Sequence, residues 1–431
     1  MKKQALIFVW LLLLVFLFLR FFAVFSDKPQ IHPGDHVKLT VMLRNEPRID
    51  GNTQVLEIFA DKARFRVYTT RFPHYQYGQK LTIVGDVSES KVGKENIGVL
   101  DKLRPDLRIY FPKIEAENSA LLFITTIRQQ IGDSMRGFLP PDEASLLIGM
   151  IFGSKEGFSE SFLQGLRDTG VLHVVAASGM NVSLLASFLM SFLLRFFNRR
   201  VAAVMVICAI ILYTLLASLA PSIVRAAIMG GIAFVASALN RQNVAVWGLA
   251  IAAYSMLLFD PFLLFDVGFQ LSLAATLGLV VVKPMVEKGI VVFAKLAKLP
   301  LLGEDVSTTI MAQVTTLPIL LGNFGTVSLA SVFVNALVLW TVPLVTILGF
   351  IAAFLSFFPF INLVPLLAAL PLLLFFKTVV IFFDKPFFLL QIKLPIIVGI
   401  GYYLIVSAVY LFLKNPRVRS EGAKNGIKDK D

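Results

Sequence analysis

Apolar runs long enough to cross a bilayer dominate the chain from about residue 170 onward. They predict nine membrane spans, near residues 171–195, 201–219, 222–240, 243–259, 264–283, 306–322, 329–356, 361–383 and 393–413. Another apolar run, ALIFVWLLLLVFLFLRFFAVF, follows the basic start MKKQ without a small-residue cleavage site, so residues 1–26 are predicted to be a retained transmembrane anchor. We therefore expect a polytopic α-helical membrane protein with about ten transmembrane helices.

Residues 27–118 follow a different pattern, in which apolar and polar positions alternate with period two. The alternation recurs at residues 36–44, 53–59, 64–70, 80–87 and 96–100, with turn-rich segments between. Short strands at this spacing predict a small antiparallel β-barrel of the OB type. Residues 119–170 predict amphipathic or interfacial helices, one of which begins at PPDEAS.

The charged residues give the predicted orientation. The chain has a formal charge of +12, and Lys and Arg gather at the N-terminus, in 195–200, 240–242 and 283–298, and in the tail 414–431. Basic loops face the cytoplasm, so we expect a multi-pass protein of the inner (plasma) membrane, in contact with membrane lipids. Both termini are then cytoplasmic and residues 27–118 are exported. Lys377, Lys385 and Lys393 fall on the opposite side, which conflicts with the placement of the last two spans.

Several polar residues lie within the predicted spans, where they default to functional hypotheses. The stretch GVLHVVAASGMNVSLLASF is the richest of them, and the helical region 171–413 is predicted to be a channel domain. For each residue the alternative is helix packing or, for the arginine, snorkelling to the headgroups. Asp266 is assigned to helix pairing or gating, and it is expected either to lie at the outer boundary of the membrane or to pair with Arg225. The predicted pathway-lining residues are His173, Ser178, Asn181, Arg225, Gln270 and Asn335.

Enzyme motifs are few. His32 and His36 flank a turn without a third ligand, which argues against a metal site, and no phosphate-binding glycine loop with its lysine occurs, so we expect neither cofactor nor ATPase activity. The single Cys208 excludes an internal disulfide. A membrane-embedded hydrolase using His173 and Ser178 remains an alternative, but the two side chains would meet only if the helix breaks at Gly179.

Four segments together resemble the ComEC family of competence membrane proteins: the block LPPDEASLLIGMIFG to VAASGMNV, then PSIVRAAIMG, DPFLLFDVGFQLSLAATLG and TTLPILLGNFGTVSLASVFVNALVLWTVP. The resemblance implies an inner-membrane channel component that translocates single-stranded DNA into the cytoplasm during natural transformation. It also implies other DNA-uptake proteins as partners, including a cytoplasmic motor, and a possible homo-oligomer.

This sequence departs from the family pattern at two places. Family members often have a histidine two residues after the Ser-Gly pair, whereas this chain has Asn181. Long members carry a C-terminal metallo-β-lactamase-like domain, and no such domain follows the last predicted span. The resemblance therefore implies a short form that is not itself a nuclease.

The predicted barrel offers arginines interleaved with aromatic residues, a pattern typical of single-strand binding. Its electrostatic attraction is modest, because residues 27–118 hold 15 Lys and Arg against 13 Asp and Glu. Ordinary core packing is the alternative for the aromatic rings. For the whole protein the rival function is transport of another envelope polymer or of a lipid. The predicted DNA contacts on the barrel are Arg64, Arg66, Tyr68, Arg71, Tyr75 and Tyr77.

Overall fold

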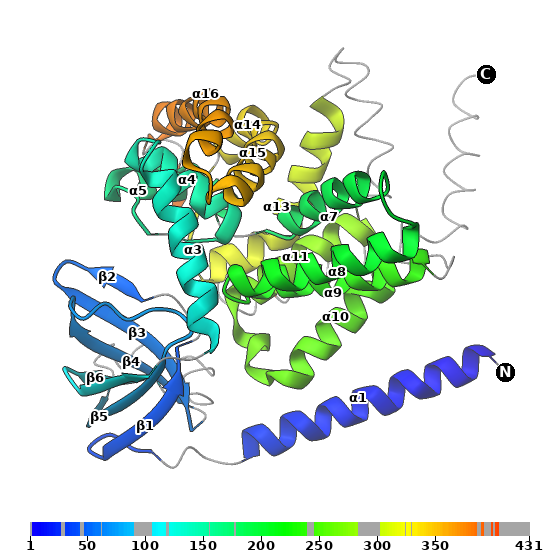
Figure 1. Ribbon diagram of the computed structural model, residues 1–431. Coiled ribbons are helices and arrows are strands. Elements are labelled where there is room, and N and C mark those ends of the chain that lie inside the picture. The colour runs from blue at the N-terminus through cyan, green and yellow to red at the C-terminus, as the bar shows by residue number, and fades with distance from the viewer. Residues whose placement is uncertain are drawn as a thin grey trace.

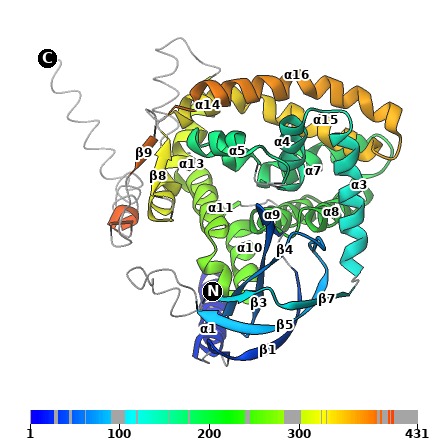
Figure 2. The same ribbon diagram turned by 90° about the vertical axis from the view of Figure 1, so that its left-hand side faces the viewer.

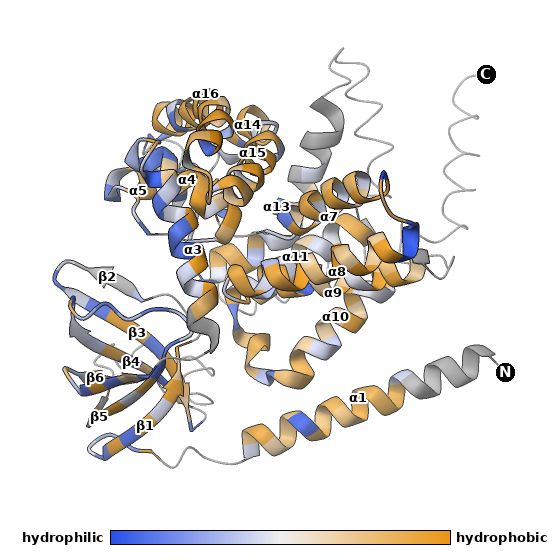
Figure 3. Ribbon diagram, in the orientation of Figure 1, coloured by the Kyte–Doolittle hydropathy of each residue, from blue (hydrophilic) through white to orange (hydrophobic). Residues whose placement is uncertain are grey.

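A computed structural model (Figure 1) describes residues 2–26, 31–43, 47–61, 63–89, 106–117, 120–154, 156–175, 178–238, 245–282, 302–323, 325–328, 330–385, 389–391, 398–399 and 401–404. The chain begins with helix α1 (Lys2–Ser26), continues into a curved sheet, and then forms a large helical region. Apolar residues cover most of the described helices, whereas the sheet mixes polar and apolar positions (Figure 3). The sheet and the helices have separate apolar cores.

The sheet has seven strands, in the spatial order β1-β5-β6-β4-β3-β2, with β7 also paired to β5. All pairs are antiparallel except β4 with β6, so the prediction of a purely antiparallel barrel is wrong at that pair. No ladder joins β1 to β3 or β2 among the described residues, so the sheet is a half-barrel rather than a closed one, and residues of β1 and β3 line a hollow of ≈ 220 Å³. The predicted strand at 96–100 lies outside the described residues. The strands are β1 (His36–Met42), β2 (Arg48–Asp50), β3 (Thr53–Ala60), β4 (Ala63–Thr70), β5 (Lys80–Glu89), β6 (Asp106–Tyr110) and β7 (Lys113–Glu117).

Strand β5 pairs with both halves of the sheet, and Gly85 lies where its partners change. Its first half pairs with β1 and β7, and its last three residues pair with β6. A Cβ atom on Gly85 would lie 2.9 Å from Ile109 Cγ2 and 2.9 Å from Pro112 Cβ, so only glycine allows this close approach. The period-two pattern determines which residues are buried. In β4, Phe65 and Val67 are fully buried, and Arg64 and Arg66 face outward.

Helices α3 (Ala120–Arg136), α4 (Pro141–Phe152) and α5 (Glu160–Asp168) follow the sheet, in the part where the sequence predicts interfacial helices. Helix α3 runs from the sheet to the helical region (Figure 2). At one end the Thr125 hydroxyl donates to the Tyr77 carbonyl at 2.9 Å. Further along, Arg128 is buried and its Nη1 donates to the Ser218 hydroxyl at 2.5 Å. These contacts attach the sheet to the helices.

The remaining elements form two neighbouring groups of helices, with α7 between them (Figure 2). One group contains α14 to α16 with α4 and α5; the other contains α8 to α11, and α1 contacts α10 through stacked Trp10 and Trp247 rings. The elements are α6 (Leu172–Val175), α7 (Gly179–Leu193), α8 (Arg199–Leu216), α9 (Pro221–Ala238), α10 (Ala245–Phe259), η2 (Pro261–Phe265), α11 (Val267–Leu277), η3 (Gly278–Val282), α13 (Leu302–Asn323), β8 (Thr326–Ser328), α14 (Ser331–Val338), α15 (Thr341–Leu355), α16 (Pro359–Phe383) and β9 (Leu389–Gln391).

Two helices among the described residues are long and apolar enough to cross a membrane, Arg199–Leu216 and Phe360–Phe383. Six shorter apolar helices accompany them, and a count of ten spans stays a prediction. The expected spans 171–195 and 329–356 are each divided into two helices, and 264–283 begins with the 3-10 helix η2. Most of the expected span 393–413 lies outside the described residues.

Candidate functional site

The polar stretch GVLHVVAASGMNV is the place where the predicted span 171–195 breaks. Helix α6 ends at Val175, and α7 begins at Gly179, with Ser178 in extended conformation at the N-cap position. Asn181 is buried and its side-chain amide donates to the carbonyl of Met150 near the end of α4. The last carbonyls of a helix lack intrahelical donors, so Asn181 satisfies one of them. The Tyr213 hydroxyl likewise donates to the carbonyl of Ile151, at 2.7 Å.

His173 lies on the short helix α6, with its ring exposed. Its Nδ1 atom is 3.0 Å from the carbonyl oxygen of Gly170, one turn earlier. The Ser178 hydroxyl donates instead to the Asn181 side-chain oxygen, at 3.3 Å. In the described part of the chain no hydrogen bond joins His173 to Ser178, so this structure does not assemble the serine–histidine pair that a hydrolase needs.

Arg225 of α9 points toward the start of α7. Its side chain is 9% exposed, and its Nη1 donates to the hydroxyl of Ser272 on α11. A Cβ atom on Gly179 would lie 3.0 Å from Arg225 Nη2, which places the guanidinium against the first turn of α7. Arg225 Nε has no acceptor, and no carboxylate among the described residues pairs with this guanidinium.

Of the two placements expected for Asp266, the pairing with Arg225 is wrong. Asp266 is exposed and stands at the N-cap of α11, where Oδ1 accepts from the backbone N–H of Phe269 at 2.7 Å. Aspartate at this position stabilises a helix because it satisfies a first-turn N–H. Gln270, one turn later, donates to the Leu264 carbonyl at 2.8 Å, so both residues shape the junction of η2 and α11.

Asn335 lies apart from the other polar residues, on α14. It is 3% exposed, and its Oδ1 has no donor. Ser331, one turn earlier on the same helix, accepts from Gln313 at 2.7 Å. The structure therefore brings Ser178, Asn181 and Arg225 together around Gly179 and leaves Asn335 on another helix.

An ion cluster that the sequence analysis missed joins α4 to α16. Lys377 Nζ lies 3.0 Å from Asp142 Oδ2 and 3.1 Å from Glu143 Oε1, and Glu143 is 2% exposed. Partial burial alone would raise the pKa of Asp142, but hydrogen bonds from Ser159 and Lys377 outweigh it, so this pKa lies below its usual value. A signal was present in the sequence: a lone lysine in an apolar span needs an acidic partner, and the motif PPDEAS supplies two.

The outer face of the sheet carries a second cluster, which we call the arginine–tyrosine face: Arg66 and Tyr68 of β4 beside Arg108 and Tyr110 of β6. The register places Arg66 opposite Arg108 and Tyr68 opposite Tyr110. The two tyrosine rings stack with centroids 5.0 Å apart, and Arg108 lies 5.8 Å from the centre of the Tyr68 ring. Arg64, on the same face of β4, pairs with Glu57 at 2.7 Å.

The predicted barrel residues divide into exposed and buried ones. Arg71 is exposed and lies over the ring of Phe72, itself 74% exposed. Tyr75 and Tyr77 are each 5% exposed, so the prediction that their rings offer stacking surfaces is wrong for this conformation. Arg108 and Tyr110 were missed, although the alternation in DLRIY (106–110) matches that of the predicted strands.

Among the residues that the structure describes, no group of three or more His, Cys, Asp or Glu side chains is placed to hold a metal ion.

Apolar helices, polar side chains buried between them and an appended half-barrel define a membrane-type helical protein with an N-terminal β domain. The family model described as Competence protein matches residues 150–417, more than half of the chain, and the chain belongs to that family, also called ComEC. The family is a membrane protein family with a role in DNA uptake during competence. The resemblance seen in the sequence is thereby confirmed.

One curated relative is similar to part of the chain. The chain is 28% identical to the ComE operon protein 3 of Bacillus subtilis (strain 168) over 215 residues. These residues are 50% of this chain and 26% of that protein, so the matched region is about a quarter of the relative's length. No solved structure matches the chain.

Proposed function

We propose that this protein is an inner-membrane channel component that binds single-stranded DNA on its arginine–tyrosine face and passes it through the helical region into the cytoplasm. The observation that carries the proposal is the pairing of Arg66 with Arg108 and of Tyr68 with Tyr110 on adjacent strands, in a chain of the Competence protein family. The half-barrel is then the exported receiving domain, and both termini are cytoplasmic.

The chemistry of this face fits a nucleic acid strand. Two guanidinium groups on neighbouring strands attract phosphates, and the release of counterions makes such binding steeply salt-dependent. The Tyr110 ring is 48% exposed and presents a flat surface on which one base stacks, at about 1–3 kcal/mol per base. Every base has such a face, so the site favours single strands without selecting a sequence.

Transport itself is assigned to the helical region, with His173, Ser178, Arg225 and Gln270 as pathway residues. We assign the driving force to a cytoplasmic motor and any strand degradation to another protein or domain, because the chain has no nucleotide-binding or nuclease motif. Neither rival, a polymer or lipid transporter or a hydrolase, has an observation of its own in the described structure.

The first prediction tests the arginine–tyrosine face in the full chain, purified in maltoside detergent. We expect the double variant Arg66→Gln with Arg108→Gln to bind a fluorescent oligothymidine at least ten-fold more weakly, with a salt dependence shallower by about two phosphate contacts. The matched control is Lys38→Gln with Lys113→Gln, which removes two exposed charges from β1 and β7. Fluorescence anisotropy over a salt series measures both.

Entry of labelled DNA into the cytosol of a deletion strain completes the test. Wild type and the lysine control restore entry, and the arginine variant does not, at equal membrane abundance. If wild type fails to restore entry, or if both double variants bind the oligonucleotide equally, the proposed function is wrong and polymer transport takes its place.

A further inference from the structure

The first turn of α7 has no side-chain cap, which it shares with α4, α14, α15 and α16 but not with α5 or α8. In α8 the Asn198 side chain accepts from the N–H of Val201 at 3.0 Å, and in α5 the Ser159 hydroxyl accepts from Phe162 at 3.4 Å. The N-cap residue of α7, Ser178, makes no such bond, since its hydroxyl donates to Asn181 instead. The first N–H groups of a helix have no intrahelical acceptors. The Asn181 N–H reaches the Ser178 carbonyl at 3.1 Å, whereas the N–H groups of Gly179 and Met180, at the positive end of the helix dipole, have no acceptor among the described residues.

A buried cation faces this same helix end. The Arg225 guanidinium is nine-tenths buried, its Nε lacks an acceptor, and its Nη2 lies against Gly179. The described residue that it contacts through Nη1 is the neutral hydroxyl of Ser272. Burial of a guanidinium without a counter-ion is costly, and proximity to a positive helix end adds to the cost. An anion between the two would remove both penalties.

From this geometry we infer that the first turn of α7, Arg225 and Ser272 form a binding site for a phosphate-type oxyanion. The backbone N–H groups of Gly179 and Met180 and the planar fork of the guanidinium supply donors from two directions, as phosphate oxygens require. Gly179 matters because a methyl group there would lie 3.0 Å from Nη2 and 3.2 Å from Ala226 Cβ, in the space where the guanidinium meets the helix.

The occupant that we assign is one phosphodiester of a DNA strand, and this assignment rests on the proposed function. Ser178 is half-buried and Met180 is 40% exposed, so the outer side of the first turn is open to a passing strand. A single phosphate site of this kind holds the strand by its backbone, without reading bases. A lipid headgroup or free phosphate offers the same chemistry, and the test separates the three sources.

The test uses the full chain in maltoside micelles, which contain no phosphate, and follows thermal unfolding with three probes. These are inorganic phosphate, an oligothymidine and added phosphatidylglycerol. The oligothymidine arm uses the Arg66→Gln/Arg108→Gln background, so that the sheet face does not contribute. We expect phosphate and oligothymidine to raise the melting temperature in a saturable way.

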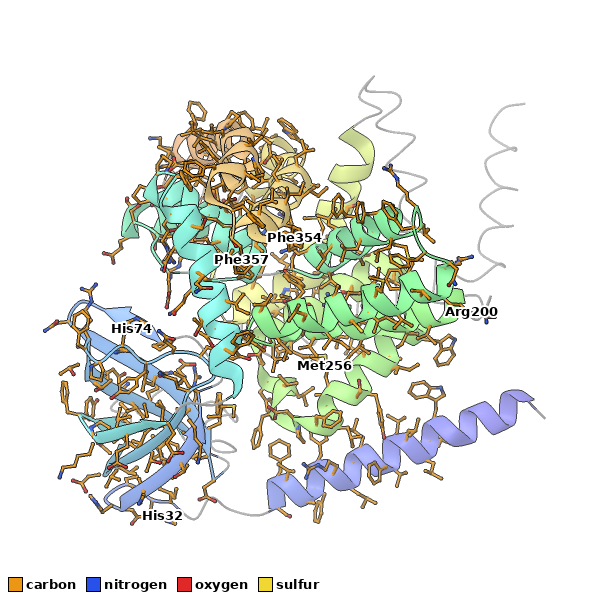
Figure 4. All side chains as sticks on the ribbon, viewed as in Figure 1. His32, His74, Arg200, Met256, Phe354 and Phe357 are labelled. Atoms are coloured by element: carbon orange, nitrogen blue, oxygen red, sulfur yellow. The ribbon has the colours of Figure 1, made fainter. Side chains whose placement is uncertain are left out.

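The variants change either the Arg225 guanidinium or Gly179 in the first turn of α7. Arg225→Gln weakens phosphate binding at least ten-fold, and Arg225→Lys weakens it less, because an ammonium keeps the charge but not the fork. Gly179→Ala keeps the arginine and also weakens binding, which preserves the test if Arg225→Gln fails to fold. The control is Arg200→Gln, an equal loss of charge at the periphery of the helical region (Figure 4). Its binding stays at the wild-type value.

Each outcome decides a separate claim. If none of the three probes stabilises wild type, or if the Arg225 and Gly179 variants bind like wild type, the anion site is overturned. If only phosphatidylglycerol gives a shift that depends on Arg225, the strand is overturned as occupant in favour of a lipid headgroup. If the Arg225-dependent site binds phosphate but labelled DNA never enters cells, the site stands and the proposed function fails.

Discussion

Single polar side chains decide the local geometry of this protein, and Gln54 is the plainest case. It is fully buried in β3 and its amide donates to the carbonyls of Thr70, Arg71 and Pro73, at 3.3, 3.0 and 3.0 Å. Its oxygen accepts from the N–H of Tyr75 at 3.0 Å. One side chain therefore holds the segment that carries Arg71 outward and turns the Tyr75 ring into the core.

Replacement of Gln54 by leucine is expected to loosen the 70–75 segment selectively. The substitution keeps the volume but leaves buried backbone groups unpaired, which lowers the local free energy of opening by about 2 kcal/mol. Hydrogen exchange of the Tyr75 amide in the full chain measures the change. Gln76→Leu is the control, since the Gln76 side chain is only half-buried; equal acceleration in both variants would contradict the assignment.

Residue-scale features were also the hardest to predict from sequence. The sequence singled out Asn181 and Arg225 as polar groups in apolar spans, and both are buried as that pattern indicates. Their partners were not predictable, because Met150 and Ser272 are 31 and 47 residues away and a backbone carbonyl carries no sequence signal. The predicted exposure of Tyr75 and Tyr77 was wrong for a different reason. Outside a strand, alternation of residue types does not indicate which rings face the core.

Ion pairing between helices sets the relation of α4 to α16. Glu143 is almost fully buried and meets Lys377 at 3.1 Å, so removal of the lysine leaves an uncompensated charge. We expect Lys377→Met to lower the free energy of unfolding by about 3 kcal/mol, measured by thermal unfolding of the full chain in detergent. Lys385→Met, an exposed residue just past α16, should have little effect.

One further variant and one condition test this ion pair. Addition of Glu143→Gln to Lys377→Met should restore part of the stability, because the orphaned charge is removed. The low pKa of Asp142 contributes stability that is present above its unfolded value of about 4 and is lost as the pH falls through the lower folded value. The variant Lys377→Met should therefore lose less stability than wild type on acidification. An identical dependence of stability on pH in the two proteins would contradict the pairing of Lys377 with Asp142.

Elements followed the sequence pattern wherever periodicity was long and regular. The strands predicted at 36–44, 53–59, 64–70 and 80–87 agree with β1, β3, β4 and β5 to within two residues at each end, because alternation reflects which side of a strand is buried. Helix breaks were less visible. The divided spans at Ser178 and near Trp340 are apolar enough for a continuous helix, and the local signals of a break are only Gly179 at the first and Pro343 just after the second.

For the whole molecule, the proposed orientation places the half-barrel outside the membrane and the basic 195–200 segment in the cytoplasm. In a Cys208→Ser background, Phe72→Cys should react with a membrane-impermeant maleimide in intact cells, because the half-barrel is proposed to be exported. Arg200→Cys should react only after the membrane is opened, because the basic 195–200 segment is proposed to be cytoplasmic. Gel-shift labelling measures both. Labelling of Arg200→Cys from outside would reverse the proposed topology.

The parallel pairing of β4 with β6 governs the order in which the N-terminal domain is completed during synthesis. Strand β6 lies between β4 and β5, so among the described strands the pieces β2-β3-β4 and β1-β5 share no ladder until residues 106–110 are made. Until then each piece presents an open edge, the kind that recruits foreign strands. A nascent chain stopped before residue 106 is thus expected to hold two ribbons without a shared ladder, and the last central strand joins them into one sheet.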